Sequence, residues 1–136
     1  MLGLACCSTG AAAQVAVIAH KDVPADSLVK DQVLDFYTGE VLSWPSSELE
    51  VVVCDLRLKG AVKDTFYQYL GKSSSRMKSI WLKRRLAGEG DPPESFQTEE
   101  ELVHYVAATP GAIGFVHLSK INGNVKVLDE IYDEER

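Results

Sequence analysis

The sequence predicts a single α/β domain in which helices flank a mixed sheet. Its length of 136 residues suits one hydrophobic core. Short β-branched runs alternate with segments of helical spacing, which is the element order of a layered α/β domain. The last run follows a glycine-containing turn typical of antiparallel neighbours, so strands of both directions are expected. In chain order we expect strand 14–19, helix 26–36, strand 49–54, helix 61–70, helix 75–86, helix 99–108, strand 112–118 and strand 125–128, all within one domain over residues 14–136.

The first two elements follow from residue type and spacing. The run QVAVIA at 14–19 is apolar on both faces, as in a strand covered by helices on each side. Asp26 or Ser27 can cap the helix that follows, in which apolar residues recur at helical spacing up to Phe36. A glycine ends that helix, and a Trp-Pro pair then indicates a loop.

The middle of the chain repeats this alternation. The run LEVVVC at 49–54 predicts the second strand, and the turn 55–60 leaves its carboxyl end. Helix 61–70 is amphipathic and stops at a glycine. Serines at 73–75 can cap the next helix, whose spacing turns Trp81 toward the core.

The last third of the chain predicts a helix and two strands. Thr98 and the three glutamates after it form a capping box for helix 99–108. A Pro-Gly turn leads into AIGFVHL at 112–118, whose apolar density predicts a central strand. The turn at 122–124 is of hairpin type, so strand 125–128 is expected to pair antiparallel with what precedes it. The acidic tail beyond this strand is expected to fray.

The charge balance narrows the classes of partner. The chain carries 20 acidic and 14 basic residues, a formal net charge of -6. Nucleic acid is not an expected partner, because a phosphate backbone requires a basic face. Only the stretch 72–85 is basic, and a solvated helix face is its plain interpretation. No run approaches the roughly 18 apolar residues of a membrane span, so none is expected in the mature chain.

Residues 1–13 have the character of a signal peptide. They are small and apolar and end in three alanines, an A-x-A pattern of the kind that signal peptidase cleaves. The positive n-region is missing, which fits a leader truncated at its start. A lipid anchor at Cys7 is the weaker alternative, because Cys6 stands where a small residue is usual. Removal of the leader would leave Cys54 as the remaining cysteine, expected to be a buried small hydrophobe.

The sequence contains no recognisable catalytic or metal-binding pattern. His20, His104 and His117 have no partner at metal-ligand spacing and stand near no nucleophile turn, so each is expected to be structural or on the surface. Phosphate-loop, dinucleotide-binding and C-x-x-C motifs are missing from the sequence. We expect a protein that is not an enzyme and that uses neither cofactor nor metal; a phosphatase or other hydrolase is the least favoured alternative.

One turn has a physical rationale for ligand binding. Open α/β sheets bind ligands beyond the carboxyl ends of their strands, and a helix N-terminus presents unpaired N–H groups to an anion. The turn after strand 49–54 combines both features with basic side chains. The candidate ligand-binding residues are Arg57, Lys59, Gly60, Ala61, Val62 and Lys63.

Two motifs resemble a known family, the substrate-binding proteins of phosphate ABC transporters. FYTG at 36–39, followed by Trp-Pro, is similar to a φ-x-G-x-x-x-x-W stretch of that family, and TPGAIGFV at 109–116 is similar to its T-P-G-A-I-G-Y-V. Between them, LGKS at 70–73 and GEGDPP at 88–93 are similar to segments of its short, stand-alone members. The resemblance extends over about residues 15–121 with matching order and spacing.

This resemblance implies a single periplasmic-binding-protein-like lobe, a location in the periplasm and phosphate as the ligand class. Full-length relatives hold phosphate between two lobes with hydroxyls and main-chain N–H groups, including a serine in an R-x-x-G-S-G-T-like turn. The corresponding turn is DLRLKGAVK at 55–63, which has no hydroxyl, and Gly60 aligns with the family serine. HKDV at 20–23 replaces the family's turn rich in glycine and serine after the first strand. One lobe supplies only half of the donors that a buried dianion demands.

Two functions therefore stay open. The first is a periplasmic solute-binding-type protein that binds phosphate or a related oxyanion for transport or sensing, with a membrane transporter as its partner. The second is an envelope interaction or scaffold protein that keeps the fold without a ligand and contacts another envelope protein or a second copy of itself. A rise in melting temperature with phosphate would favour the first.

Overall fold

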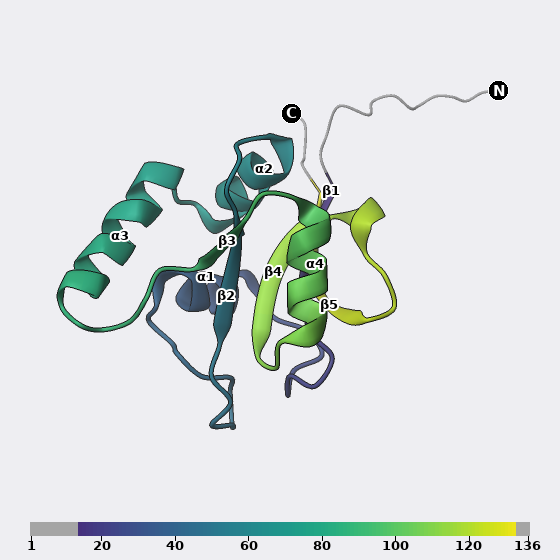
Figure 1. Cartoon of the computed structure of the whole chain (residues 1–136), viewed down its shortest axis with the longest axis horizontal. Helices are drawn as coiled ribbons and strands as arrows, with labels where there is room; N and C mark the ends of the chain where they lie inside the picture. The colour runs from purple at the N-terminus through teal and green to yellow at the C-terminus, as the bar shows by residue number, and fades with distance from the viewer. Residues whose placement is uncertain (1–13, 133–136) are drawn as a thin grey trace.

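A mixed five-stranded sheet in the order β3-β2-β4-β1-β5 forms the centre of the molecule (Figure 1). The structure, a computed structural model, describes residues 14–132. Helix α4 covers one face of the sheet, α1 and α2 lie behind it, and α3 stands to one side. The elements are β1 (Gln14–His20), α1 (Lys30–Thr38), β2 (Val52–Leu56), α2 (Ala61–Leu70), α3 (Ser74–Leu86), β3 (Glu94–Phe96), α4 (Glu99–Ala108), β4 (Ala112–His117), the 3-10 helix η2 (Leu118–Lys120) and β5 (Val125–Tyr132).

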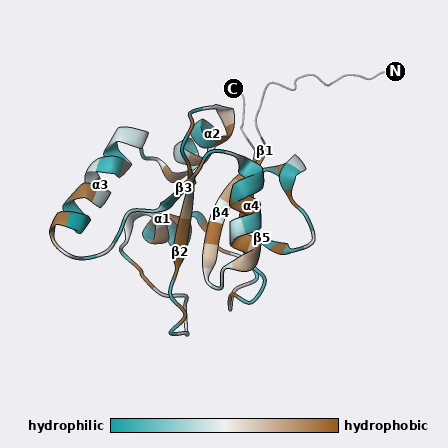
Figure 2. Ribbon diagram, viewed as in Figure 1, coloured by the Kyte–Doolittle hydropathy of each residue, from teal (hydrophilic) through white to brown (hydrophobic). Residues whose placement is uncertain are grey.

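The predicted central strands are confirmed. β4 lies in the middle of the sheet, parallel to β2 and antiparallel to β1. β1 is buried from Val15 to Ala19 because α2 and α4 pack against its two faces. The apolar colouring of the strands, against mixed colouring on the helices, follows this burial (Figure 2). The predicted leader at 1–13 and the end of the acidic tail lie outside the described residues.

Aromatic side chains fill the core behind β2 and β4. Phe66 of α2 stacks on Phe115 of β4 with the ring centroids 4.0 Å apart. Tyr37 of α1 packs edge-on against Phe66, and its hydroxyl donates to the carbonyl of Cys54 at 2.8 Å. Cys54 is fully buried, as its apolar surroundings in the sequence predicted.

The Pro-Gly turn before β4 packs against the loop that connects α1 to β2. The indole of Trp44 is buried and donates to the carbonyl of Gly111 at 2.9 Å. Gly111 has a φ of 85°, and a Cβ at this position would lie 2.2 Å from the carbonyl oxygen of Glu50. A residue without a side chain is therefore required at this point of close approach.

Helix α1 begins later than predicted. Its N-cap is Val29, whose N–H donates to the side chain of Gln32, so neither Asp26 nor Ser27 caps it. The segment before the helix is extended and is fixed to β5 by the N–H of Leu28, which donates to the carbonyl of Leu128. This long-range contact prevails over the local capping preference. The helix ends as predicted at a left-handed glycine.

The C-terminal strand differs from the predicted hairpin. After β4 the chain forms η2 and passes over β1, so that β5 pairs antiparallel with the far edge of β1 rather than with β4. The strand is also longer than 125–128, because Glu130 and Ile131 pair with Ala16 and Val15. The acidic residues up to Tyr132 are therefore part of the sheet rather than frayed.

The remaining differences between the predicted and the observed elements are smaller. β3 was missed, because three residues after a Pro-Pro pair give no period to detect. β2 begins at Val52, since Glu50 forms an isolated bridge with Ser43 instead. The predicted caps Ser73 and Thr98 are confirmed by hydrogen bonds to the third residue of α3 and of α4. Within residues 14–132 no helix combines the length and apolarity needed to cross a membrane.

Candidate ligand-binding site

The predicted turn lies at the carboxyl end of β2, where it feeds directly into α2. Gly60 is the N-cap of α2 in an extended conformation, with no side chain to satisfy the helix start. The first hydrogen bond of the helix runs from the N–H of Asp64 to the carbonyl of Gly60. The N–H groups of residues 61–63 precede that bond, so they are available to an acceptor placed beyond the helix.

Five of the six predicted residues line one hollow. Residues 59–63 form one wall of a cavity of about 330 Å³, and the opposite wall is the start of α4 at 97–100 together with Lys120. Arg57 is not in it: this exposed side chain lies on the far side of the turn and donates to the carbonyl of Ser95 at 3.3 Å. The structure thus separates Arg57 from the other five.

Lys63 is engaged within the protein. Its ammonium donates to the carbonyl of Leu56 at 2.6 Å and lies 3.9 Å from a carboxylate oxygen of Asp55. The residue is 9% exposed. Most of its positive charge is compensated locally, which leaves Lys59 as the exposed cation of the helix start.

Asp55 is a site residue that the sequence analysis missed. One carboxylate oxygen accepts from the N–H of Leu56 at 2.8 Å and the other from the hydroxyl of Tyr67 at 2.6 Å. Burial raises the pKa of Asp55, while Tyr67 and Lys63 act in the opposite direction. An acidic residue directly after an apolar run was the available signal, but the partner on α2 is twelve residues away and no spacing rule links the two.

The acidic residues at the start of α4 are also paired. A carboxylate oxygen of Glu99 accepts from the N–H of His117 at 2.7 Å, and Glu100 contacts Lys120 at 2.6 Å. The hydrogen bond from Lys120 lowers the pKa of the exposed Glu100. Three glutamates already complement the positive end of α4. The free donors of the hollow therefore lie on the α2 side.

The described residues offer little for catalysis. Burial raises the pKa of the Cys54 thiol to about 12, so it stays protonated and unreactive at neutral pH. His20 accepts from the N–H of Asp22, and His117 contacts the Ser119 hydroxyl, both local turn contacts. No group of three or more His, Cys, Asp or Glu side chains within residues 14–132 could hold a metal ion.

The fold defines the class: it is that of one periplasmic-binding-protein-like lobe, as the resemblance implied. A phosphate ABC transporter substrate-binding protein with bound phosphate from Clostridium perfringens superposes with a TM-score of 0.71 at 19% identity, over 86% of this chain and 44% of that one. An ABC-type phosphate transport receptor from Vibrio cholerae superposes with a TM-score of 0.69 at 14% identity, over 86% of this chain and 46% of that one.

PstS from Borrelia burgdorferi gives a TM-score of 0.63 at 11% identity, over 86% of this chain and 47% of that one. The chain thus spans less than half the length of these solved proteins. No protein-family model and no curated protein matches its sequence. At these identities the likeness establishes the fold, which the chain shares with a phosphate-transporter substrate-binding protein and a phosphate transport receptor.

Proposed function

We propose that this protein is a solute-binding-type protein that captures phosphate or a related small oxyanion where α2 begins. The observation that carries this proposal is the exposed first turn of α2, whose N–H groups open into a hollow beyond the carboxyl end of β2. This is the position at which open α/β sheets and helix dipoles favour an anion. The phosphate-bound neighbour of the same fold supports phosphate as the first ligand to test.

The expected binding is weak. Lys59 is the exposed cation at the site, Lys63 is already paired, and Arg57 points elsewhere. A dianion held in one lobe keeps part of its hydration, so it gains fewer charge-assisted hydrogen bonds than an enclosed ion would. Such a protein would respond to high local concentrations of the anion or would need a partner to complete the cage.

Location and partner follow from the same proposal. The leader-like residues 1–13 and the phosphate-transport neighbours both favour export to the periplasm. A membrane transporter is then the partner that would receive the anion.

A scaffold role is the second candidate, and the state of the site favours it. The turn has no hydroxyl, and its most buried cation is neutralised by Asp55. In addition, α3 exposes Leu82 and Leu86, with 58% and 78% of their surface accessible. These two leucines are neighbours at i and i+4 on one helix, so together they supply apolar surface for a contact with another protein. A phosphate-silent protein that self-associates would favour this role.

Isothermal titration of the full chain with phosphate tests the primary proposal. We expect a saturable heat that weakens in Lys59→Gln and falls with ionic strength. Lys72→Gln, the same charge change beyond the end of α2, is the matched control and should bind like the parent. Sulfate distinguishes a phosphate site from a general oxyanion site. Absence of heat at millimolar phosphate would overturn the proposal.

A further inference from the structure

A second cavity lies on the other side of the turn, under α3. Its volume of about 360 Å³ falls within the range of roughly 300–1,000 Å³ that is typical of small-molecule sites. A single face of α3 forms the upper wall, because the contributing positions recur every three or four residues. They are Ser74, Met77, Lys78, Trp81, Leu82 and Arg85.

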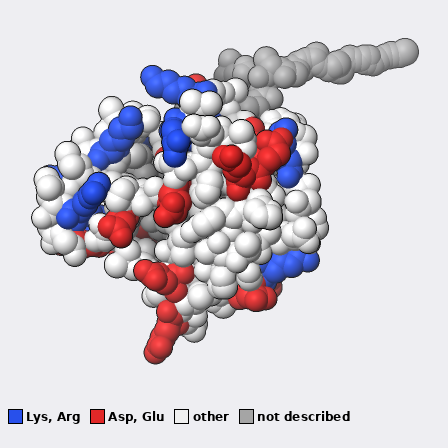
Figure 3. Space-filling model, in the orientation of Figure 1, with Lys and Arg blue, Asp and Glu red and all other residues white. Residues whose placement is uncertain are grey.

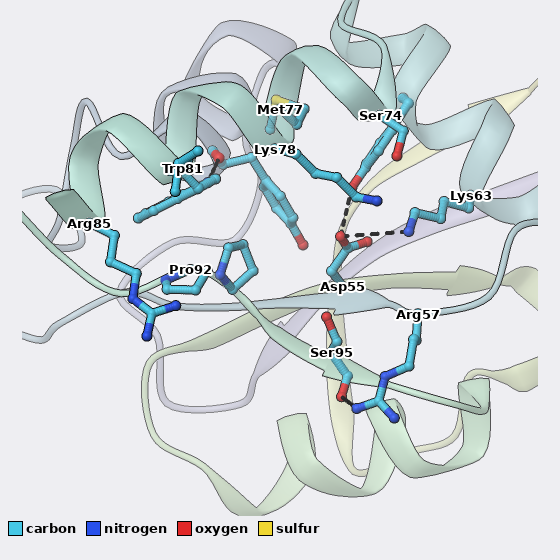
Figure 4. Close-up of a pocket in the computed structure, with 14 residues that line it drawn as sticks. Asp55, Arg57, Lys63, Ser74, Met77, Lys78, Trp81, Arg85, Pro92 and Ser95 are labelled. Atoms are coloured by element: carbon cyan, nitrogen blue, oxygen red, sulfur yellow. Dashed lines mark hydrogen bonds and ion pairs between the residues drawn. The ribbon is translucent and has the colours of Figure 1, made fainter.

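One end of this α3 cleft is lined by the apolar side chains of Trp81, Pro92 and Pro93. The indole of Trp81 donates to the carbonyl of Tyr37 at 2.7 Å, which fixes the plane of the ring. Pro92 and Pro93, in the segment before β3, form the facing wall. Figure 4 shows Trp81 reaching down from α3 toward Pro92 across the cavity. Two such walls suit a planar apolar group.

The rim of the cleft is strongly cationic. Arg57, Lys63, Lys78 and Arg85 line it against a single carboxylate, that of Asp55, so four positive and one negative group give a local excess of three positive charges. The protein as a whole carries a formal net charge of -6. Basic side chains gather over α3 in the view of Figure 3. A cleft lined by positive charges attracts a negatively charged ligand, even though the net charge of the protein is negative.

Two of these cations are uncommitted. Asp55 is occupied by Tyr67 and Lys63, and Arg57 donates to Ser95. By contrast, Lys78 and Arg85 make no hydrogen bond or ion pair with any side chain or carbonyl of residues 14–132. Figure 4 shows both extending from α3 beside Trp81, Lys78 toward Asp55 and Arg85 at the opposite end.

We propose that the α3 cleft binds a small organic anion with a planar apolar body. The apolar body lies between Trp81 and Pro92, and the anionic group faces Lys78 or Arg85 at the rim. Inorganic phosphate does not fit this description, because it would leave the apolar walls unused. The cleft is separate from the hollow at the start of α2, although Lys63 borders both. The proposal therefore does not rest on the proposed function.

The test uses 2-naphthoate as the probe, titrated into the full chain and followed by calorimetry and by tryptophan fluorescence. We expect 2-naphthoate to bind saturably and to quench the fluorescence of Trp81. Neutral 2-naphthol, which has the same ring system, should bind more weakly by roughly tenfold. The double variant Lys78→Gln with Arg85→Gln should lose a similar factor. Arg76→Gln with Lys83→Gln is the matched control, since these residues line the opposite face of α3, and it should bind within about twofold of the parent.

The outcomes separate this site from the oxyanion site. Phosphate binding without 2-naphthoate binding would overturn the cleft proposal and leave the proposed function standing. The reverse result would support the cleft and remove the oxyanion site. Equal affinity for 2-naphthol, or an equal loss in the control variant, would contradict an anion site at the Lys78 and Arg85 rim.

Discussion

At the scale of single residues, Gly111 is the described glycine with the least room for a side chain. Alanine there would meet the carbonyl of Glu50 and adopt a left-handed backbone. Gly111→Ala should lower the free energy of unfolding by about 2–4 kcal/mol, measured by urea denaturation. Gly88→Ala is the matched control: its φ of 73° is similar, but nothing lies within 4 Å of the added carbon. It should cost only about 1 kcal/mol. Equal losses would show that the close contact with Glu50 has no effect.

Gly60 is the residue at which a single substitution is expected to strengthen phosphate binding. Its φ of 163° is extended backbone, and an added Cβ meets nothing within 4 Å. Gly60→Ser should therefore fold normally, because the backbone is extended and the added side chain has room. It would place a hydroxyl beside the free N–H groups, so phosphate binding should tighten by roughly three- to tenfold, measured by calorimetry. Gly123→Ser, equally unhindered and distant, should leave binding unchanged. An unaltered or weaker affinity in Gly60→Ser would argue against the helix start as the site.

Asp55 links stability to pH. Burial raises the pKa of its carboxyl above the ordinary 3.8, so the folded protein holds this proton more tightly than the unfolded chain does. That contribution to stability is complete below pH 3.8 and is lost as the pH rises through the raised pKa.

Asp55→Asn cannot ionise at this position. Its stability relative to the parent should therefore improve as the pH rises above 3.8 and through the raised pKa of Asp55, measured by denaturation over a range of pH values. Asp64→Asn makes the same charge change at an exposed position and serves as the control. A constant difference between Asp55→Asn and the parent across this range would contradict the assignment.

At the scale of secondary-structure elements, α3 is the part expected to open first. It buries only Met77 and Trp81, and two side-chain donors, Trp81 and Arg84, attach it to the carbonyls of Tyr37 and Thr38 at the end of α1. Trp81→Phe keeps a ring but leaves the Tyr37 carbonyl without this donor. Amides of α3 should then exchange with deuterium roughly tenfold faster or more, while those of β4 stay protected. Trp44→Phe, which also loses an indole donor, should not accelerate α3 preferentially.

Local signals predicted most elements, and long-range pairing explains the failures. The caps Ser73 and Thr98 and the apolar run of β4 act within a few residues, so the sequence reveals them. The start of α1 depends instead on Leu28 reaching Leu128, and the length of β5 depends on β1 at the other end of the chain. Spacing rules contain no information about such partners.

The candidate site was predictable in part for the same reason. The helix start at Gly60 follows from adjacent residues, and the structure keeps residues 59–63 in one hollow. The pairing of Lys63 with Asp55 and the position of Arg57 beside Ser95 depend on how β2, β3 and α2 pack together. The basic stretch 72–85 was interpreted as a solvated face, and only the structure divides it between the α3 cleft and the opposite face.

At the scale of the whole molecule, the openness of the hollow at the start of α2 determines how tightly an anion can bind. The chain has the fold of less than half of each solved substrate-binding protein reported above. The start of α2 offers N–H groups and one exposed lysine, Lys59, while the facing wall of the hollow is the acidic start of α4. Capture should therefore be weak and salt-sensitive, and a partner or second copy that closed the hollow would strengthen it.

The most direct measurement is an amide NMR titration of the full chain with inorganic phosphate at constant ionic strength. An oxyanion seated at the start of α2 should shift the amide signals of residues 60–63 in a saturable manner, because those N–H groups would donate to it. The indole signal of Trp81, in the separate α3 cleft, should stay in place. Unchanged amides at 60–63, or shifts confined to another part of the molecule, would contradict an oxyanion site at this helix.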